Sequence, residues 1–318
     1  MFAGIDIGGT KCAVTLGSIK DEAVEIINKT MFKTSDYSNP YDVLERLADE
    51  LEKMQCERIE AIGISCGGPL DSKKGVIMSP PNLPGWDNIK IKDFFEERFK
   101  AKTFLQNDAD ACVVAEWKFG AAKGLENVVF LTFGTGLGAG LILNGRLYSG
   151  TNFMAGEVGH IRLSEFGAVG YGKSGSAEGF CSGGGIAQIG RIKALELLQS
   201  GKDCLFCRSY EELDKITAET IARAADSGDL CALEVYRISG RKLGELLSIL
   251  IDLLNPQMIV IGSVYTRSSH LLKTEMSKVI ETETLSVSRK NCIISKAALG
   301  DLIGDYAAIS VAYYGIVG

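Results

Sequence analysis

Short apolar runs and helical repeats alternate along the chain. Apolar runs bounded by polar or glycine positions predict strands at 2–7, 12–16, 24–32 and 61–65. Between the last two strands, apolar residues recur three and four positions apart over 41–57, which predicts an amphipathic helix. Strands that alternate with helices in this way indicate an α/β fold.

The alternation continues to residue 261. A helix at 91–99 and a strand at 103–105 lead into Asn107-Asp108, and a helix at 109–119 follows. Residues 164–185 are rich in glycine, and we expect them to be irregular. The other expected elements are strands at 128–132, 137–143 and 257–261, helices at 186–198, 217–225 and 231–254, and an extended loop at 79–86 that holds three of the six prolines.

Two of the predicted hairpins turn at a cluster of glycine and threonine. The first turn is Gly8-Gly9-Thr10-Lys11, and the second is Gly134-Thr135-Gly136, followed by Gly138. Unobstructed backbone N–H groups in such turns bind anions, and two facing turns would suit a triphosphate. Each cluster is also typical of an ordinary turn, in which glycine supplies a positive φ. Two copies of one strand–turn–strand unit indicate a duplicated architecture.

Polar side chains follow two of the predicted strands. At the first turn Thr10 adds a hydroxyl, Lys11 adds a cation, and Asp6 is placed to hold Mg²⁺ through water. Asn107-Asp108 lies between a strand and a helix, where open α/β sheets bind ligands. An aspartate there can accept the proton of an attacking hydroxyl. Asn and Asp are also preferred helix N-caps, and the local sequence by itself favours capping by Asp108.

A carboxylate and an imidazole lie close together in Gly156-Glu157-Val158-Gly159-His160. Both groups suit hydrogen bonding to sugar hydroxyls, and the imidazole would also suit zinc. A solvent-facing turn is the alternative. The other histidine, His270, receives no role. The close pair Cys204 and Cys207 has no second pair or nearby histidine, which favours an ordinary loop over a zinc or redox site.

Composition narrows the class of protein. A length of 318 residues favours two domains, and 46% hydrophobic with 23% charged residues is typical of a globular protein. A net charge of −6 without a long basic run argues against nucleic acid or an acidic membrane as partner. No apolar stretch is long enough to span a bilayer. Nine scattered cysteines and no secretory signal predict reduced thiols in a cytoplasmic protein.

Taken in order, these motifs resemble the ROK family of sugar kinases and sugar-responsive repressors. The resemblance spans nearly the whole chain, and it outweighs the alternative interpretations of the single motifs. It is carried by Asp6 to Lys11, Gly67-Gly68-Pro69-Leu70-Asp71, residues 79–86, Asn107-Asp108-Ala109, Gly134 to Gly138, Gly156 to His160, Glu178 with Ser182-Gly183, and Asn255-Pro256 before 259–262.

The resemblance implies an actin-like, hexokinase-like ATPase fold, in which two α/β domains close around a cleft. A small N-terminal domain would comprise 1–107 with 300–318, and a larger C-terminal domain would comprise 108–299. The last helix, within 302–314, would pack back on the first domain. A homodimer is expected, because dimers are usual in such kinases.

The resemblance also implies ATP and Mg²⁺ as cofactors and assigns the site residues. Asp108 would be the catalytic base, and glucose is the first choice of substrate. The sugar would meet Gly68, Asn82, Asn107, Asp108, Glu157, His160 and Glu178. ATP would meet Asp6, Gly8, Gly9, Thr10, Lys11, Gly134, Thr135, Gly136, Gly138 and Gly262, with Asp6 holding the magnesium ion through water.

The chain departs from the family pattern in three places. Many members carry a zinc motif whose three cysteine positions are here Val169, Tyr171 and Ser176. None of these replaces a thiolate, so we expect no zinc and a His160 that is oriented by hydrogen bonds. Ser263 replaces a second glycine near the adenosine. The acidic Asp301 and Asp305 lie in a usually apolar segment and have no interpretation from the sequence.

Two alternatives to a glucokinase stay open. An N-acylmannosamine or other hexosamine kinase is the runner-up, because the altered loop 169–176 could open room near the sugar C2. A sugar-sensing regulator is the alternative from another class. Family repressors carry an N-terminal helix-turn-helix domain, whereas this chain starts with the first glycine turn, and its acidic charge disfavours DNA.

Overall fold

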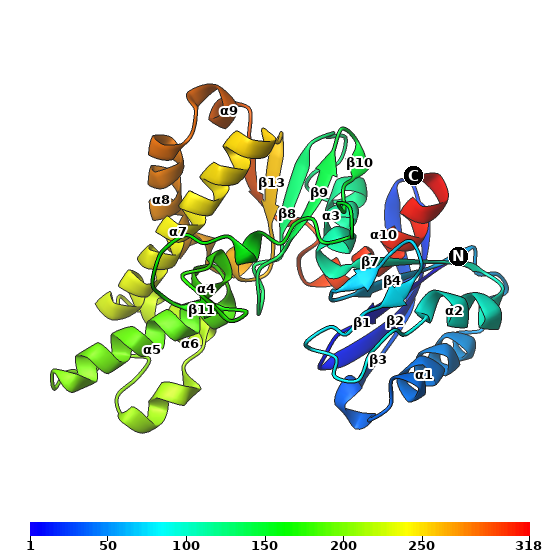
Figure 1. Ribbon diagram of the computed structural model, residues 1–318, viewed down its shortest axis with the longest axis horizontal. Coiled ribbons are helices and arrows are strands. Elements are labelled where there is room, and N and C mark those ends of the chain that lie inside the picture. Colours follow the sequence, from blue (N-terminus) through cyan, green and yellow to red (C-terminus); the bar gives the residue numbers. More distant parts are fainter. The chain divides into compact units, whose positions relative to one another are not determined.

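The computed structural model describes residues 1–318, which form two compact units (Figure 1). Unit one contains residues 1–130, 140–156 and 298–318, and unit two contains 131–139 and 157–297. Residues 108–130 and 140–156 are expected in the second domain, whereas both segments pack in unit one. The boundary between functional domains that is expected after residue 107 remains a prediction.

A five-stranded sheet forms the centre of unit one. Its strand order is β3-β2-β1-β4-β7, and β4 is parallel to both β1 and β7. Ile7, Cys66 and Asn107 therefore lie side by side at the carboxyl ends of three strands. This edge is where an open α/β sheet presents ligand-binding residues. The strands are β1 (Phe2–Ile7), β2 (Lys11–Lys20), β3 (Ala23–Lys33), β4 (Ala61–Cys66) and β7 (Lys102–Asn107).

Helices cover both faces of this sheet. On one face α1 (Pro40–Lys53) and α2 (Ile91–Phe99) pack on the buried side chains of β1. On the other face α10 (Ile303–Val317) lies so close that a Cβ at Gly63 would overlap the Ala308 carbonyl oxygen. Only glycine permits this approach. The resemblance implied this packing of the last helix.

Asp305 has a structural partner that the sequence did not reveal. Its side chain is 4% exposed, and its Oδ2 forms an ion pair with Lys29 Nζ at 2.7 Å. Its Oδ1 accepts a hydrogen bond from Thr15 Oγ1 at 3.2 Å. Thr15 and Lys29 are opposite each other on β2 and β3. The acidic residue therefore fastens the first turn of α10 to two strands, which an apolar residue would not do.

The first unit also includes α3 (Asp108–Phe119), whose apolar face packs against α10. Its remaining strands are short. They are the hairpin β5 (Leu70–Asp71) with β6 (Val76–Ile77), and β10 (Arg146–Leu147), which pairs with β9 (Ala139–Leu143). Strands β8 (Val128–Leu131) and β9 start in one unit and end in the other.

Unit two is mainly helical. Its long helices α7 (Leu230–Leu254) and α8 (Val264–Glu283) pack together, and Gly240 and Gly244 on α7 permit the close approach. Strand β13 (Met258–Ile261) is parallel to β14 (Ile293–Lys296). Further helices of this unit are α5 (Gly183–Gln199), α6 (Ala218–Asp226) and α9 (Ser286–Lys290).

Residues 164–185, expected to be irregular, contain regular structure. Strands β11 (Val169–Gly170) and β12 (Lys173–Ser174) form a hairpin, and the one-turn helix α4 (Ala177–Phe180) follows. The sequence pattern did not predict these elements, because each is only two to four residues long and glycines surround them. None of the helices combines the length and the apolar character that a bilayer crossing needs.

Candidate functional site

The first glycine turn is held by a backbone hydrogen bond from Gly8 N to Lys11 O at 3.0 Å. Neither Gly8 nor Gly9 has a positive φ. The interpretation of this segment as an ordinary turn, in which glycine supplies a positive φ, is therefore wrong. Glycine is needed at position 9 for a different reason. A Cβ there would overlap the backbone carbonyl oxygen of Asn82. Two predicted site residues therefore touch through their main chains.

Thr34 fixes the shape of this turn, a role that no sequence motif predicted. Its Oγ1 donates to Gly8 O at 2.6 Å, and its backbone N–H donates to Thr10 O at 3.1 Å. The Cys12 thiol lies 3.3 Å from the same hydroxyl oxygen. Thr34 directly follows β3, and only the pairing of β2 with β3 brings it to the turn. A local motif search cannot find such a contact.

Asp6 lies in an acidic part of unit one. Its pKa is raised to about 7, chiefly by burial and also by the carboxylates of Asp108 and Asp305, while Lys11 and Lys29 oppose the change. Asp305 is already paired with Lys29, so Asp6 and Asp108 are the carboxylates left to attract a cation. Oxygen ligands at a partly dehydrated site suit Mg²⁺ held through water. The residues present therefore fit the magnesium role expected for Asp6.

Asn107, rather than Asp108, caps helix α3. Its Oδ1 accepts the backbone N–H of Ala109 at 2.9 Å, whereas Asp108 is the first helical residue. The local prediction that Asp108 serves as the N-cap is therefore wrong. The Asp108 side chain is exposed, although its Oδ1 also accepts from Ala109 N at 2.8 Å. Its other oxygen is thus able to meet a substrate hydroxyl.

The pKa of Asp108 lies above its ordinary value. The surrounding protein removes part of the hydration of its carboxylate and raises the pKa, and the backbone N–H groups of Ala109 and Asp108 partly offset this. A general base is most effective when its pKa approaches the working pH. The shift therefore suits the predicted role.

Asn82 and Gly68 lie beside these residues. The proline-rich loop is anchored by Leu83 and Trp86, whose side chains are buried in the core of unit one. A Cβ at Gly68 would be 3.0 Å from Asn107 Nδ2, and one at Gly67 would be 3.4 Å from Asn82 Oδ1. Unit one thus brings together all of its predicted site residues: Asp6, Gly8 to Lys11, Gly68, Asn82, Asn107 and Asp108.

The second glycine hairpin belongs to unit two. Thr132 closes it, donating from its backbone N–H to Gly138 O at 3.0 Å and accepting from Gly138 N at its Oγ1 at 2.9 Å. A further bond runs from Gly134 N to Gly136 O at 3.0 Å, and Thr135 is exposed at the tip. Gly183 N at the start of α5 donates to Gly134 O at 2.8 Å. The hairpin is thus closed by Thr132 and docked on a helix.

Glu157 and His160 are both exposed; Glu157 precedes the short 3-10 turn Val158–His160, and His160 is its last residue. Lys173 Nζ donates to the backbone carbonyl of His160 at 2.6 Å. Ser176, at a predicted zinc-ligand position, is buried and caps α4 through a bond from Gly179 N at 3.2 Å. The structure contains no group of three or more histidine, cysteine, aspartate or glutamate side chains arranged to hold a metal ion.

Glu178 has a contact that the sequence did not predict. Its Oε2 accepts the backbone N–H of Leu137 at 3.0 Å, so a residue predicted to bind sugar also holds the glycine hairpin. Gly262, expected near the adenosine, is buried, and its N–H donates to Leu131 O at 3.0 Å. The neighbouring Ser263 has φ of 50°, a conformation that favours glycine.

The remaining candidates have structural explanations. Cys204 and Cys207 exchange two backbone hydrogen bonds of 3.1 Å, which describes a tight loop. All nine cysteines are free. His270 lies 2.7 Å from Asp226 Oδ1 at the surface.

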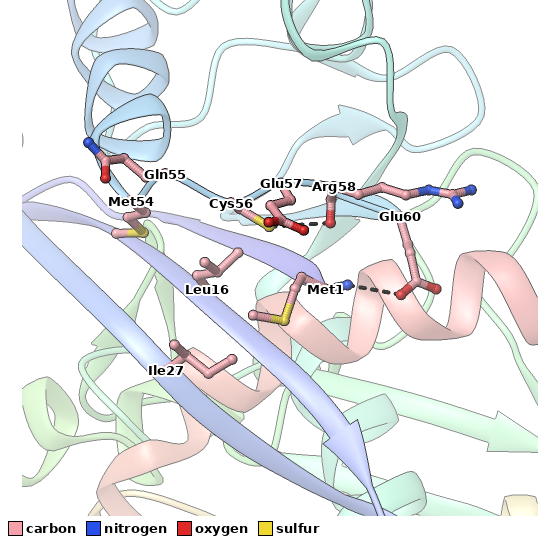
Figure 2. A pocket seen from close by; sticks show the side chains of 9 residues that line it. All are labelled: Met1, Leu16, Ile27, Met54, Gln55, Cys56, Glu57, Arg58 and Glu60. Carbon is pink, nitrogen blue, oxygen red and sulfur yellow. Dashed lines mark hydrogen bonds and ion pairs between the residues drawn. The ribbon is translucent and has the colours of Figure 1, made fainter.

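Figure 2 shows a groove in unit one that is separate from the predicted site residues. It has a volume of about 610 Å³ and includes Met1, Leu16, Met54, Cys56 and Glu60 in its lining. It lies at the amino end of β1, whereas the first glycine turn follows the carboxyl end. The groove contains none of the residues assigned to sugar or ATP.

Comparison with known proteins defines the class. The pattern of the ROK family matches residues 2–312, and the chain belongs to that family. A glucokinase from Halalkalibacterium halodurans is 30% identical over 311 residues, which cover 95% of this chain and 92% of the relative. The DNA-binding transcriptional dual regulator NagC of Escherichia coli is also 30% identical over 311 residues, which cover 96% of this chain and 74% of the regulator.

Solved structures establish the fold. A ROK family glucokinase from Streptomyces griseus, in complex with glucose and AMPPNP, is 27% identical with a TM-score of 0.77, and the match covers 99% of each chain. The ROK hexokinase from Thermus thermophilus is 27% identical with a TM-score of 0.78, again over 99% of each chain. The chain therefore has the mixed α/β, actin-like ATPase fold of these hexokinases.

Proposed function

We propose that this chain is an ATP-dependent sugar kinase that phosphorylates a hexose, with glucose as substrate and a sugar 6-phosphate as product. The observation that carries the proposal is Asp108. It has an exposed carboxylate with a raised pKa at the carboxyl end of a parallel strand, beside Asp6 and Asn107. The glucokinase relative and the glucokinase complex with glucose and AMPPNP support the same activity.

In this proposal Asp108 accepts the proton of the sugar hydroxyl while the hydroxyl oxygen attacks the terminal phosphorus of ATP. The bond from that phosphorus to ADP breaks, and ADP leaves. Asn82, Asn107, Glu157, His160 and Glu178 orient the sugar by hydrogen bonds.

The glycine turns at 8–10 and 134–136 offer backbone N–H groups to the phosphates in this proposal. Asp6 holds Mg²⁺ through water, and Lys11 adds a positive charge beside the first turn. The magnesium ion neutralises charge on the phosphates when it is bound.

A coupled assay of ADP release against a panel of hexoses and hexosamines tests the proposal. Glucose is expected to give the highest kcat/KM. Asp108→Asn removes the base and keeps the size and the helix position of the side chain, so turnover should be lost while sugar binding is kept. Asp93→Asn is the matched control, because Asp93 is an exposed aspartate in the first turn of α2. Full turnover in Asp108→Asn would show that the assigned base is wrong.

A sugar-binding regulator is the second candidate, supported by the 30% identity to NagC. It predicts sugar binding without ADP release for any sugar in the panel. A hexosamine kinase predicts ADP release that is highest with a hexosamine.

A further inference from the structure

Glu178 lies at the junction of three segments of unit two. A Cβ at Gly136 in the glycine hairpin would be 2.7 Å from Glu178 Oε2, and one at Gly170 in β11 would be 2.6 Å from Glu178 Cβ. A Cβ at Gly159, beside His160, would overlap the Leu137 carbonyl oxygen and lie 3.3 Å from Glu178 Cβ. Three glycines thus allow three backbones to surround one carboxylate side chain.

The main chain near Glu178 is joined to the same hairpin. Ser182 Oγ donates to the carbonyl oxygen of Glu178 at 2.7 Å, and the same Oγ accepts from Gly185 N at 2.9 Å as the cap of α5. The next residue, Gly183, donates from its N–H to Gly134 O at 2.8 Å. The hairpin therefore has a hydrogen bond to the Glu178 side chain through Leu137, and one to the segment after Glu178 through Gly134.

We propose that Glu178 is a positioning residue that couples sugar binding to nucleotide binding. The inference rests on the proposed function, which gives the sugar to Glu178 and the phosphates to the hairpin. A carboxylate can accept hydrogen bonds at both oxygens. Oε2 takes the Leu137 N–H, and Oε1 takes a sugar hydroxyl.

A sugar bound at Oε1 restricts the rotation of the Glu178 side chain. The Leu137 N–H is then held in one position, and so is the turn that precedes it. Nucleotide binds with less ordering cost to a turn that is already held. Linkage requires the converse as well, so that nucleotide tightens sugar binding by the same factor.

The first test measures the affinity of magnesium-AMPPNP by calorimetry, with and without saturating glucose. In the wild type we expect glucose to tighten AMPPNP binding about fivefold or more. Without sugar, Glu178→Ala should weaken AMPPNP binding about tenfold, because it removes a hydrogen bond to a charged acceptor. Glu178→Gln keeps an acceptor oxygen and should stay within about threefold of the wild type.

The second test follows amide hydrogen exchange in the ligand-free protein. Glu178→Ala should speed exchange at the Leu137 amide about tenfold, whereas Glu178→Gln should not. The Gly138 amide is an internal control, because it donates to Thr132 Oγ1 and not to Glu178. Glu165→Ala, at an exposed glutamate in the same unit, is the control variant and should match the wild type in both tests.

The outcomes separate the inference from the proposed function. Wild-type protein that binds no AMPPNP overturns both. Wild-type protein that binds glucose and AMPPNP independently overturns the coupling and leaves the kinase proposal standing. Unchanged AMPPNP affinity and Leu137 exchange in Glu178→Ala also overturn the coupling alone. Faster exchange throughout unit two in that variant would show a general loss of structure and would likewise contradict a local positioning role.

Discussion

The two glycine turns look alike in the sequence and differ in how they are held. In unit one, Thr34 clamps the turn, and Gly9 lies against the backbone of Asn82. In unit two, Thr132 closes the hairpin, and Gly136 lies against the Glu178 carboxylate. The glycines of both turns, at 8, 9, 134, 136 and 138, lack a positive φ. At positions 9 and 136 glycine therefore permits close approach, and the neighbour approached decides how strictly it is required, whereas a Cβ at Gly134 would meet no atom closer than 3.7 Å.

Gly9→Ala is expected to have the largest effect. Its Cβ would overlap a backbone oxygen of Asn82, which cannot rotate away, so the turn or the proline-rich loop must shift. A displacement of this kind lowers kcat/KM about hundredfold. Steady-state kinetics with glucose and ATP measure it. Wild-type kinetics in Gly9→Ala would show that the contact is not rigid.

Asp6 in unit one should make nucleotide binding depend on pH. Asp6 must be ionised to hold a cation, and its pKa is raised to about 7. The protonated form therefore predominates below pH 7, and the affinity for magnesium-AMPPNP should fall about tenfold between pH 8 and pH 6. The matched variant Asp6→Asn should bind more weakly at pH 8 and lose most of this pH dependence. An equal pH dependence in the variant would assign the titration to another group.

Gly136→Ala should cost less than Gly9→Ala. Its Cβ would lie 2.7 Å from Glu178 Oε2, the end of a side chain that can rotate. Moving that carboxylate breaks the bond to Leu137, and we expect AMPPNP affinity to fall about tenfold, as for other moderately overpacked sites. A loss as large as that of Gly9→Ala would remove the distinction between a fixed and a movable neighbour.

Thr34→Val tests the clamp in unit one. Valine keeps the shape of threonine and removes the hydroxyl that donates to Gly8 O. The free energy of unfolding in urea should fall by about 1 kcal/mol. Thr274→Val, at an exposed position of α8, is the control for the change of residue type. Equal stability of Thr34→Val and wild type would mean that the hydroxyl does not hold the turn.

Ser263→Gly is expected to have the smallest effect and the opposite sign. Ser263 adopts φ of 50°, which costs a non-glycine residue free energy. Glycine relieves this cost but raises the conformational entropy of the unfolded chain, which offsets part of the gain, so an increase of about 0.5 kcal/mol in unfolding free energy is expected. Thermal unfolding measures it. A clear loss of stability would indicate that the serine hydroxyl, 3.4 Å from Arg267 Nη2, matters more than the strain.

Sequence patterns predicted most of the fold. The strand expected at 24–32 is β3 at Ala23–Lys33, and the helix expected at 91–99 is α2 with the same bounds. The long helix α8 was not predicted, because its polar residues and the kink at Ser268 break the helical repeat. The elements between 164 and 185 are too short to produce a period.

Site residues that belong to local motifs could be predicted from the sequence. Site contacts between residues far apart in the chain could not. The glycine turns and the residues around Asp108 follow from short segments. The clamp by Thr34, the ion pair of Asp305 with Lys29 and the bond from Leu137 to Glu178 join residues 26, 276 and 41 positions apart. Only the folded chain shows such pairs. Likewise, Asn107 and not Asp108 is the N-cap of α3, because β7 continues to Asn107 and the helix starts at Asp108.

The most direct test of the account compares turnover and sugar binding in Asp108→Asn. The rate of glucose 6-phosphate formation and the Kd of glucose are measured on the same preparations of variant and wild type. The account predicts a rate at least about hundredfold below that of the wild type, with a glucose Kd within about threefold of it. A rate close to that of the wild type, or wild-type protein that forms no sugar phosphate, would contradict it.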